Sequence, residues 1–245
     1  MFPCNRTEQT GVENGIFHIK GSIAAGLTLV ILLATTTAFA QSGAIDPLEG
    51  NIDADVDSAE SIKPHNSAGD PVAGKEKSEL CQGCHGEHGV STEPLIPKLA
   101  GQYSSYISKQ VHDYQVGNRT HRIMSAVAPL VDDDDLDDIA AYFASQKKMK
   151  GDGSEDNPLG KELFLHGNNS RPRFACVSCH GVKGKGLAGG HSMIPVLGGQ
   201  HMDYIRRQLL NFRKGDRTNA KIMNRIAGSL TDTEIKSLAE YISVQ

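Results

Sequence analysis

The sequence of 245 residues contains no tryptophan, and aromatic residues make up only 5% of it. After its N-terminal part, the chain consists of two short repeated units, which are described below. A unit so short can form only a small core, which is marginal without a disulfide, a metal or a cofactor to complete it. We therefore expect something large and apolar to fill the core of each unit.

An excess of basic residues is also lacking, because 25 Lys and Arg stand against 29 Asp and Glu. This balance gives no indication of nucleic-acid binding. The charge is nevertheless uneven: residues 41–68 hold six acids and one lysine, residues 69–150 hold twelve acidic and nine basic side chains, and residues 151–245 hold nine acidic and thirteen basic ones. This uneven distribution makes the molecule an electric dipole, which can orient it toward a charged partner at low salt.

Long apolar runs are absent except for "IAAGLTLVILLA" at residues 23–34. Arg6 and Lys20 precede this run, and "AFA" follows it, ending at Ala40. A basic region, an apolar region and an A-x-A site in this order are typical of a secretory signal. We expect residues 1–40 to be a signal peptide that exports the protein to the periplasm. The alternative is an uncleaved anchor, because the run and its flanking small residues just reach the length of a span.

No cysteine is spare for a structural disulfide framework. Cys4 precedes the apolar run and would leave with the signal peptide. The remaining four lie in "CQGCH" and "CVSCH", and they are Cys81, Cys84, Cys176 and Cys179. Thiols in an oxidising compartment normally form disulfides. The position of all four inside two copies of Cys-x-x-Cys-His indicates another role.

An internal repeat organises the chain after the N-terminal part. The segment "PKLAGQYSSYISKQ" from Pro97 matches "PVLGGQHMDYIRRQ" from Pro195. Further on, "YQVGNRT" from Tyr114 matches "FRKGDRT" from Phe212, and the chain continues to match after both segments. We place a first domain at 69–150 and a second at 157–245. Residues 41–68 are acidic and poor in large apolar groups, which predicts a disordered tether.

Each repeat is predicted to contain three helices and no strand, so the fold class is all-α. The first helix begins at a proline, Pro71 or Pro158, after the N-cap candidates Asp70 and Asn157, and is expected to run to the cysteine motif. The remaining helices are predicted at 102–116 and 200–214, each ended by a glycine, and within 132–145 and 231–244.

Three kinds of site use the Cys-x-x-Cys spacing. Structural zinc sites usually take both cysteine pairs from one small domain, whereas here each repeat has its own pair and its own histidine. A thioredoxin-like dithiol needs a βαβ context, which is missing. Covalent haem accounts for every element, because Cys-x-x-Cys-His is the attachment sequence of c-type haem.

The spacing suits this chemistry. Two thiols one helical turn apart reach the two vinyl groups of the porphyrin and form thioethers, and the adjacent histidine is held under the ring, where it can bind iron. A sixth ligand is expected from elsewhere in the same repeat. Met124 and Met223 occupy matching positions in the two repeats, whereas Met193 and Met202 match no methionine.

These residues and segments resemble the diheme cytochrome c4 family, a tandem of class I cytochrome c domains that each wrap about three helices around a covalent haem. The resemblance covers both repeats. It implies two haem c groups, with the following sites: Cys81, Cys84, His85 and Met124 for the first haem, and Cys176, Cys179, His180 and Met223 for the second. It also implies that the carbonyls of Pro97 and Pro195 accept a hydrogen bond from the iron-binding imidazoles, which fixes the rings and tunes the iron.

His/Met ligation fills both axial positions and leaves no open site for a substrate, so we expect one-electron transfer and no enzyme activity. By resemblance, the protein is a periplasmic carrier between redox proteins, a quinol-oxidising complex and a terminal oxidase, that meets the membrane only through its partners or an uncleaved anchor. One alternative is the cytochrome subunit of a sulfide- or alcohol-oxidising dehydrogenase. Another is a diheme peroxidase, which needs an iron that can lose a ligand.

Two further pairs match between the repeats, Tyr106 with Tyr204 and Arg119 with Arg217. Contact with the haem edge or a propionate is one interpretation of these pairs, and an ordinary role in a helix or loop is the other.

Overall fold

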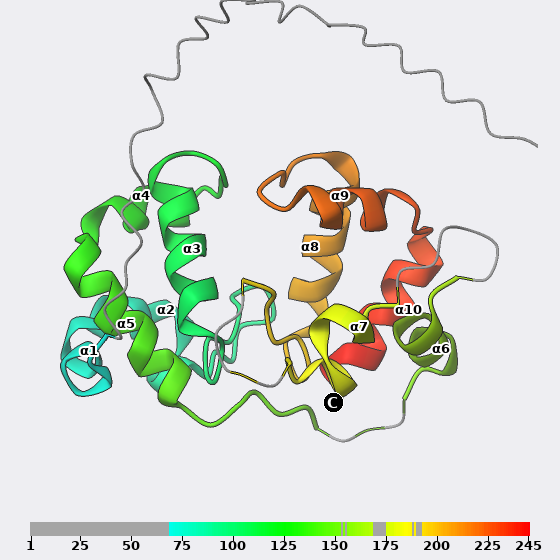
Figure 1. Ribbon diagram of the computed structural model, residues 1–245, viewed down its shortest axis with the longest axis horizontal. Helices are drawn as coiled ribbons and strands as arrows, with labels where there is room; N and C mark the ends of the chain where they lie inside the picture. Colours follow the sequence, from blue (N-terminus) through cyan, green and yellow to red (C-terminus); the bar gives the residue numbers. More distant parts are fainter. Residues whose placement is uncertain (1–68, 153, 155, 169–174, 188, 190–192) are drawn as a thin grey trace, which may run out of the picture. The chain divides into compact units, whose positions relative to one another are not determined.

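The computed structural model describes residues 69–152, 154, 156–168, 175–187, 189 and 193–245 (Figure 1). The expected signal peptide (1–40) and acidic tether (41–68) lie outside the described residues. Within the described part the secondary structure is entirely helical, without a strand, which confirms the all-α prediction. None of the helices found there is long and apolar enough to cross a membrane.

The helices of the second repeat follow the order of those in the first. The first repeat contains α1 (Pro71–Lys77), α2 (Glu79–His85), η1 (Glu87–Gly89), α3 (Ser104–Gln115), α4 (Met124–Val127), η2 (Ala128–Leu130) and α5 (Asp133–Ser145). The second contains α6 (Pro158–His166), α7 (Val177–His180), η3 (Val182–Gly184), α8 (Met202–Lys214), α9 (Lys221–Gly228) and α10 (Asp232–Ser243). The short helices α4 and α9, which hold Met124 and Met223, were not predicted.

The starts of the first helices agree with the sequence prediction. The side chain of Asp70 accepts a hydrogen bond from the backbone N–H of Val72, 2.8 Å away. Asn157 accepts one from Gly160 at 2.9 Å. Each cap pairs a backbone N–H of the first turn that has no partner inside the helix.

The prediction that these helices run to the cysteine motif was wrong. In the first repeat the helix breaks at Ser78, a fully buried residue whose hydroxyl donates to the carbonyl of Lys75. In the second, α6 ends at His166, because the next residue, Gly167, has a φ of 71°. That conformation favours glycine and ends a helix. The cysteine motifs therefore lie at separate short helices: α2 contains the whole first motif, and α7 contains the second motif except Cys176, its N-cap residue.

Two glycines bring the first and last helices of each repeat together backbone to backbone. A Cβ at Gly74 of α1 would lie 1.9 Å from the carbonyl oxygen of Asp138 in α5. A Cβ at Gly160 of α6 would lie 2.0 Å from that of Ser237 in α10. Any side chain at these positions would push the two helices apart, so the crossing requires glycine.

We predict that Gly160→Ala lowers the unfolding free energy of the second domain by about 1–3 kcal/mol, the usual cost of overpacking a tight contact. Gly228→Ala is the matched control, because a Cβ there meets nothing within 4 Å. Denaturant unfolding of the haem-containing protein, followed by circular dichroism, compares the two variants. Equal unfolding midpoints would show that the crossing tolerates a methyl group.

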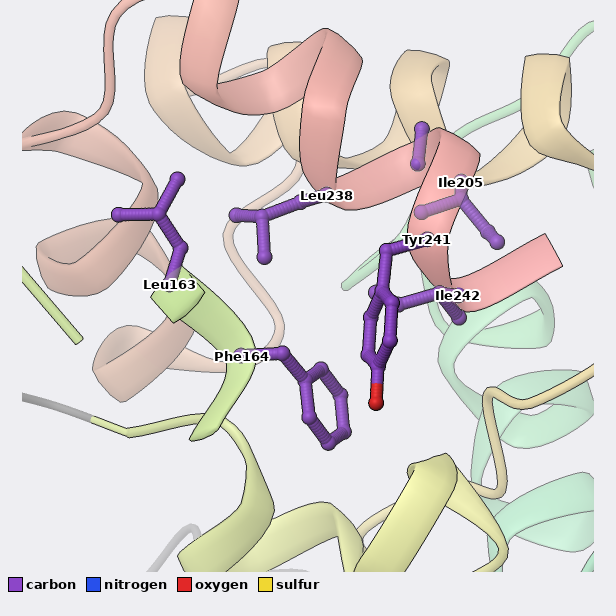
Figure 2. Packing of buried hydrophobic residues seen from close by; sticks show 7 residues of the cluster. Leu163, Phe164, Ile205, Leu238, Tyr241 and Ile242 are labelled. Carbon is purple, nitrogen blue, oxygen red and sulfur yellow. The ribbon is translucent and has the colours of Figure 1, made fainter. Parts of the chain in front are cut away.

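A small apolar core lies beside each cysteine motif. In the second repeat it consists of Leu163, Phe164, Ile205, Leu238, Ala239, Tyr241 and Ile242 (Figure 2). In the first it consists of Ile107, Ile139, Ala140, Tyr142 and Phe143. The first cysteine of each motif, Cys81 or Cys176, packs against its core. The core thus anchors one end of each motif, while the second cysteines, Cys84 and Cys179, are exposed.

Candidate haem-binding sites

The histidine of each motif is buried and oriented by one backbone carbonyl. Nδ1 of His85 lies 2.8 Å from the carbonyl oxygen of Pro97, and Nδ1 of His180 lies 2.9 Å from that of Pro195. Because a carbonyl can only accept, Nδ1 must carry the proton, and Nε2 is left with its lone pair. Burial lowers the pKa of both imidazoles, although the prolyl carbonyls oppose this shift. Both rings are thus held in the neutral form that binds metal.

A glycine directly after each histidine lets the chain turn sharply toward this proline. Gly86 has a φ of 81° and Gly181 a φ of 76°. A Cβ would lie 2.3 Å from the carbonyl oxygen of Val90 in the first case and 2.0 Å from that of Gly186 in the second. These glycines were not among the predicted site residues, although both directly follow the motif in the sequence.

The four cysteines form no disulfide with one another. Burial raises the pKa of Cys81, and it raises the pKa of Cys176 to about 11. A reactive dithiol needs a thiolate with a lowered pKa, which these surroundings do not provide. Nor do three or more His, Cys, Asp or Glu side chains gather as a metal-binding group anywhere in the part of the chain that is described.

The two matching methionines are half-buried and lie at the start of the unpredicted helices. Met124 opens α4, where its backbone N–H lies 3.4 Å from Nδ1 of His121. Met223 lies in the first turn of α9, and the side chain of the next residue, Asn224, donates to the carbonyls of Phe212 and Arg217 at 2.7 Å. Different hydrogen bonds therefore hold equivalent turns.

The other methionines are placed differently. Met193 and Met202 are 60% and 41% exposed. Met149 is buried against Tyr103 and Val196, and its sulfur accepts a hydrogen bond from Gln200 at 3.2 Å.

Glutamine side chains join the two repeats at the loops that contain the prolines. Gln102 donates to the carbonyl of Val196 and accepts from its N–H, both at 2.9 Å. Gln200 makes the equivalent pair with Lys98, again at 2.9 Å. Val196 and Lys98 each follow the proline that orients a histidine. Each repeat therefore supports the prolyl segment of the other.

The matched arginines extend this reciprocal contact. Arg119 of the first repeat donates to the hydroxyl of Tyr204 at 3.1 Å and to Gln208 at 3.0 Å. Arg217 of the second donates to Tyr106 at 3.1 Å and to Gln110 at 2.8 Å. Both arginines are buried, with exposures of 7% and 6%. Neither interpretation of these pairs anticipated a contact between the repeats.

The residues present fit a haem in each repeat. Each provides two thiols one helical turn apart and a buried imidazole whose Nε2 makes no hydrogen bond among the described residues. Among the described residues, Nε of Arg207 is the one buried side-chain polar atom that lacks a hydrogen-bond partner.

Comparison with known proteins identifies the class. The sequence model of the family described as Cytochrome c matches residues 71–147 and 159–244. Both repeats are therefore cytochrome c domains.

Individual relatives identify the family within this class. Cytochrome c4 of Pseudomonas aeruginosa is 42% identical over 181 residues, which cover 72% of this chain and 89% of the relative. The crystal structure of reduced recombinant cytochrome c4 from Pseudomonas stutzeri matches with a TM-score of 0.67 and 38% identity, covering 72% of this chain and 98% of that one. The chain belongs to the cytochrome c4 family.

A third relative has a different name. The thiosulfate dehydrogenase electron acceptor of Stutzerimonas stutzeri is 31% identical over 170 residues, which cover 66% of this chain and 77% of the relative. Together these comparisons confirm the family resemblance and the tandem fold. The protein is a diheme electron carrier with two covalently bound haem c groups.

Proposed function

We propose that the iron of the first haem is bound by Nε2 of His85 and the sulfur of Met124, and that of the second by His180 and Met223. The observation that carries this proposal is the pair of hydrogen bonds from Nδ1 to Pro97 and Pro195, at 2.8 and 2.9 Å. They orient two buried neutral rings with Nε2 as the only ring nitrogen left for iron. Haem c supplies an iron that alternates between Fe(III) and Fe(II), and His/Met ligation raises its reduction potential relative to other ligand sets.

With both axial positions filled, the chain acts as a one-electron carrier and not as an enzyme. The second cysteine of each motif, Cys84 or Cys179, is exposed. A haem attached to these cysteines would present the edge that carries the thioethers to the surface, where a partner could approach. We place the carrier in the periplasm, exported by residues 1–40, between a quinol-oxidising complex and a terminal oxidase.

The two exposed cysteines have neighbours of opposite charge. Glu79 and Glu87 are exposed and lie within five residues of Cys84 in the sequence, and the exposed Lys183 lies four residues after Cys179. This local difference has the same sign as the charge of the two domains. Donor and acceptor can therefore dock at different ends of the molecule, each recognised by charge of one sign.

Electron-transfer rates with the two partners are predicted to respond differently to salt. Raising the ionic strength should slow the reaction at each end, because it screens the attraction that steers docking. Lys183→Gln should flatten the salt dependence for the partner of the second domain, and Glu87→Gln that for the partner of the first. Stopped-flow reduction by the quinol-oxidising complex and reoxidation by the oxidase measure both. Identical slopes for the two partners, unchanged in either variant, would contradict the proposal.

A second candidate function is favoured by the relative named as a thiosulfate dehydrogenase electron acceptor. In that case the donor is a soluble or attached dehydrogenase, and the haem sites remain the same. Rapid reduction by a purified sulfur-compound dehydrogenase, at a rate exceeding that with the quinol-oxidising complex, would select this function. Peroxide turnover with a high-spin resting iron would instead select the diheme peroxidase.

A further inference from the structure

Arg207 belongs to α8 of the second domain, but its guanidinium lies against the first. Its Nη2 donates to the carbonyl oxygen of Leu95. Leu95 stands two residues before Pro97, whose carbonyl binds the imidazole of His85. The guanidinium is therefore fixed beside the segment that holds the proposed histidine ligand of the first haem.

One N–H of this guanidinium has no acceptor. Nε of Arg207 is buried and makes no hydrogen bond within the described part of the chain. Nearly all buried polar groups in proteins are hydrogen-bonded, and a cationic donor is especially costly to leave unpaired. The acceptor is therefore expected to be an anionic oxygen that the described residues do not supply.

At the matching position in the first domain, the basic residue has an acidic partner. Lys109 corresponds to Arg207, and it pairs with Asp113, one helical turn further along α3. In α8 the residue that corresponds to Asp113 is Asn211, which carries no charge. The charge of Lys109 is thus neutralised within its own helix, whereas that of Arg207 is not.

The surroundings leave room for such an anion. Arg207 and Asn211 line a cleft of about 640 Å³ between α8 and the loop at residues 93–96. Two acids, Glu93 and Asp203, line the same cleft, but no ion pair links either of them to Arg207 in the described structure. Arg206 and Lys214 add further positive charge.

We propose that Arg207 binds a carboxylate of the first haem, one of its propionates, across the boundary between the domains. The proposal rests on the ligation of that haem by His85 and Met124. A guanidinium suits this role, because it presents several N–H donors in a fixed plane to the oxygens of a carboxylate. The second domain then places a positive charge beside the first haem, which favours Fe(II) and raises the potential of that iron. A free oxyanion in the cleft has the same chemistry and is the other source of the acceptor.

The test is a potentiometric titration of the full-length, haem-containing Arg207→Gln variant, with the two haems distinguished by their NMR resonances. The Fe(III)/Fe(II) ratio of the first haem should rise about threefold at a given potential, equivalent to about 28 mV, and that of the second should change less. Lys236→Gln, which removes one positive charge elsewhere on the second domain, is the control. Should Arg207→Gln fail to retain both haems, Arg207→Lys replaces it and should shift the first haem in the same direction by less.

Phosphate distinguishes the two sources of the acceptor. At constant ionic strength, replacing chloride by phosphate should leave the wild-type potentials unchanged if a propionate binds Arg207. If a free oxyanion binds there, phosphate moves the potential of the first haem, and Arg207→Gln abolishes that response. The proposal would be overturned if Arg207→Gln shifted the reduction potential of neither haem by more than Lys236→Gln does. Absence of the methionine–iron absorption band in the wild-type protein would instead refute the ligand assignment.

Discussion

Replacing Met124 by alanine is expected to remove the methionine–iron absorption band of the first domain and to lower the potential of its haem by on the order of 100 mV. A thioether stabilises Fe(II) better than the water or hydroxide that would enter in its place, so its loss favours the oxidised iron. Met124 lies in the first turn of α4 and is only half-buried. The substitution should therefore act mainly at the iron and not through the core.

Two other methionines make this experiment specific. Met223→Ala should produce the same change in the second haem alone. Met202→Ala is the control, because Met202 is 41% exposed and has no counterpart in the first repeat. Redox titration with visible spectroscopy compares all three variants. An intact methionine–iron band of full intensity in Met124→Ala would refute the assignment of this ligand.

Removing both thiols of the second motif, with Cys176→Ser and Cys179→Ser together, should leave an exported protein with one covalent haem. Without thioethers, the second haem is held only by its axial ligands and by packing. The apolar core beside it is small and consists of one cluster. We expect the second domain to lose most of its cooperative unfolding, because so small a core is marginal without its cofactor.

Intact-mass measurement of the exported variant decides this prediction. The mass should fall by about one haem, whereas the single variant Cys176→Ser should retain a haem through Cys179 in a weaker attachment. The matched control is the corresponding double substitution in the first motif, which should remove the other haem. Two covalent haems in the variant lacking Cys176 and Cys179 would contradict the attachment sites.

Much of this architecture could be predicted from the sequence because it depends on local signals. Asp70 and Asn157 stand before prolines, and both act as helix caps in the structure. The repeat identified the tandem domains, and the cysteine motifs with their histidines indicated the haems. These signals involve neighbouring residues or matching segments, which one sequence displays directly.

The details that could not be predicted depend on partners distant in the chain. The break after α1 occurs at a serine, which is not a strong helix breaker, and it is evident only from the non-helical backbone of Ser78 (φ −86°, ψ 2°) in the structure. Hydrogen bonds between the two domains are made by the side chains of Gln102, Gln200, Arg119 and Arg217. Polar residues on a helix face carry no sign of such a partner. Matching positions, as in Arg119 and Arg217, were the available signal.

Arg207 illustrates the same limit. Its counterpart Lys109 is also basic, so aligning the two repeats shows that the positive charge is retained at this position. The alignment does not show what the change from Asp113 to Asn211 means for that charge. Only the buried, unpartnered Nε makes that change informative. A difference between two similar repeats becomes interpretable when the structure shows which contact depends on it.

Intact-mass analysis and a spectroscopic redox titration of one preparation of the exported protein test the central claim most directly. We expect the polypeptide plus two haems, a low-spin spectrum with methionine–iron absorption, and two separate one-electron steps. A mass equal to that of the bare polypeptide, or an iron that stays high-spin and binds peroxide at rest, would contradict a carrier built on two fully ligated haems.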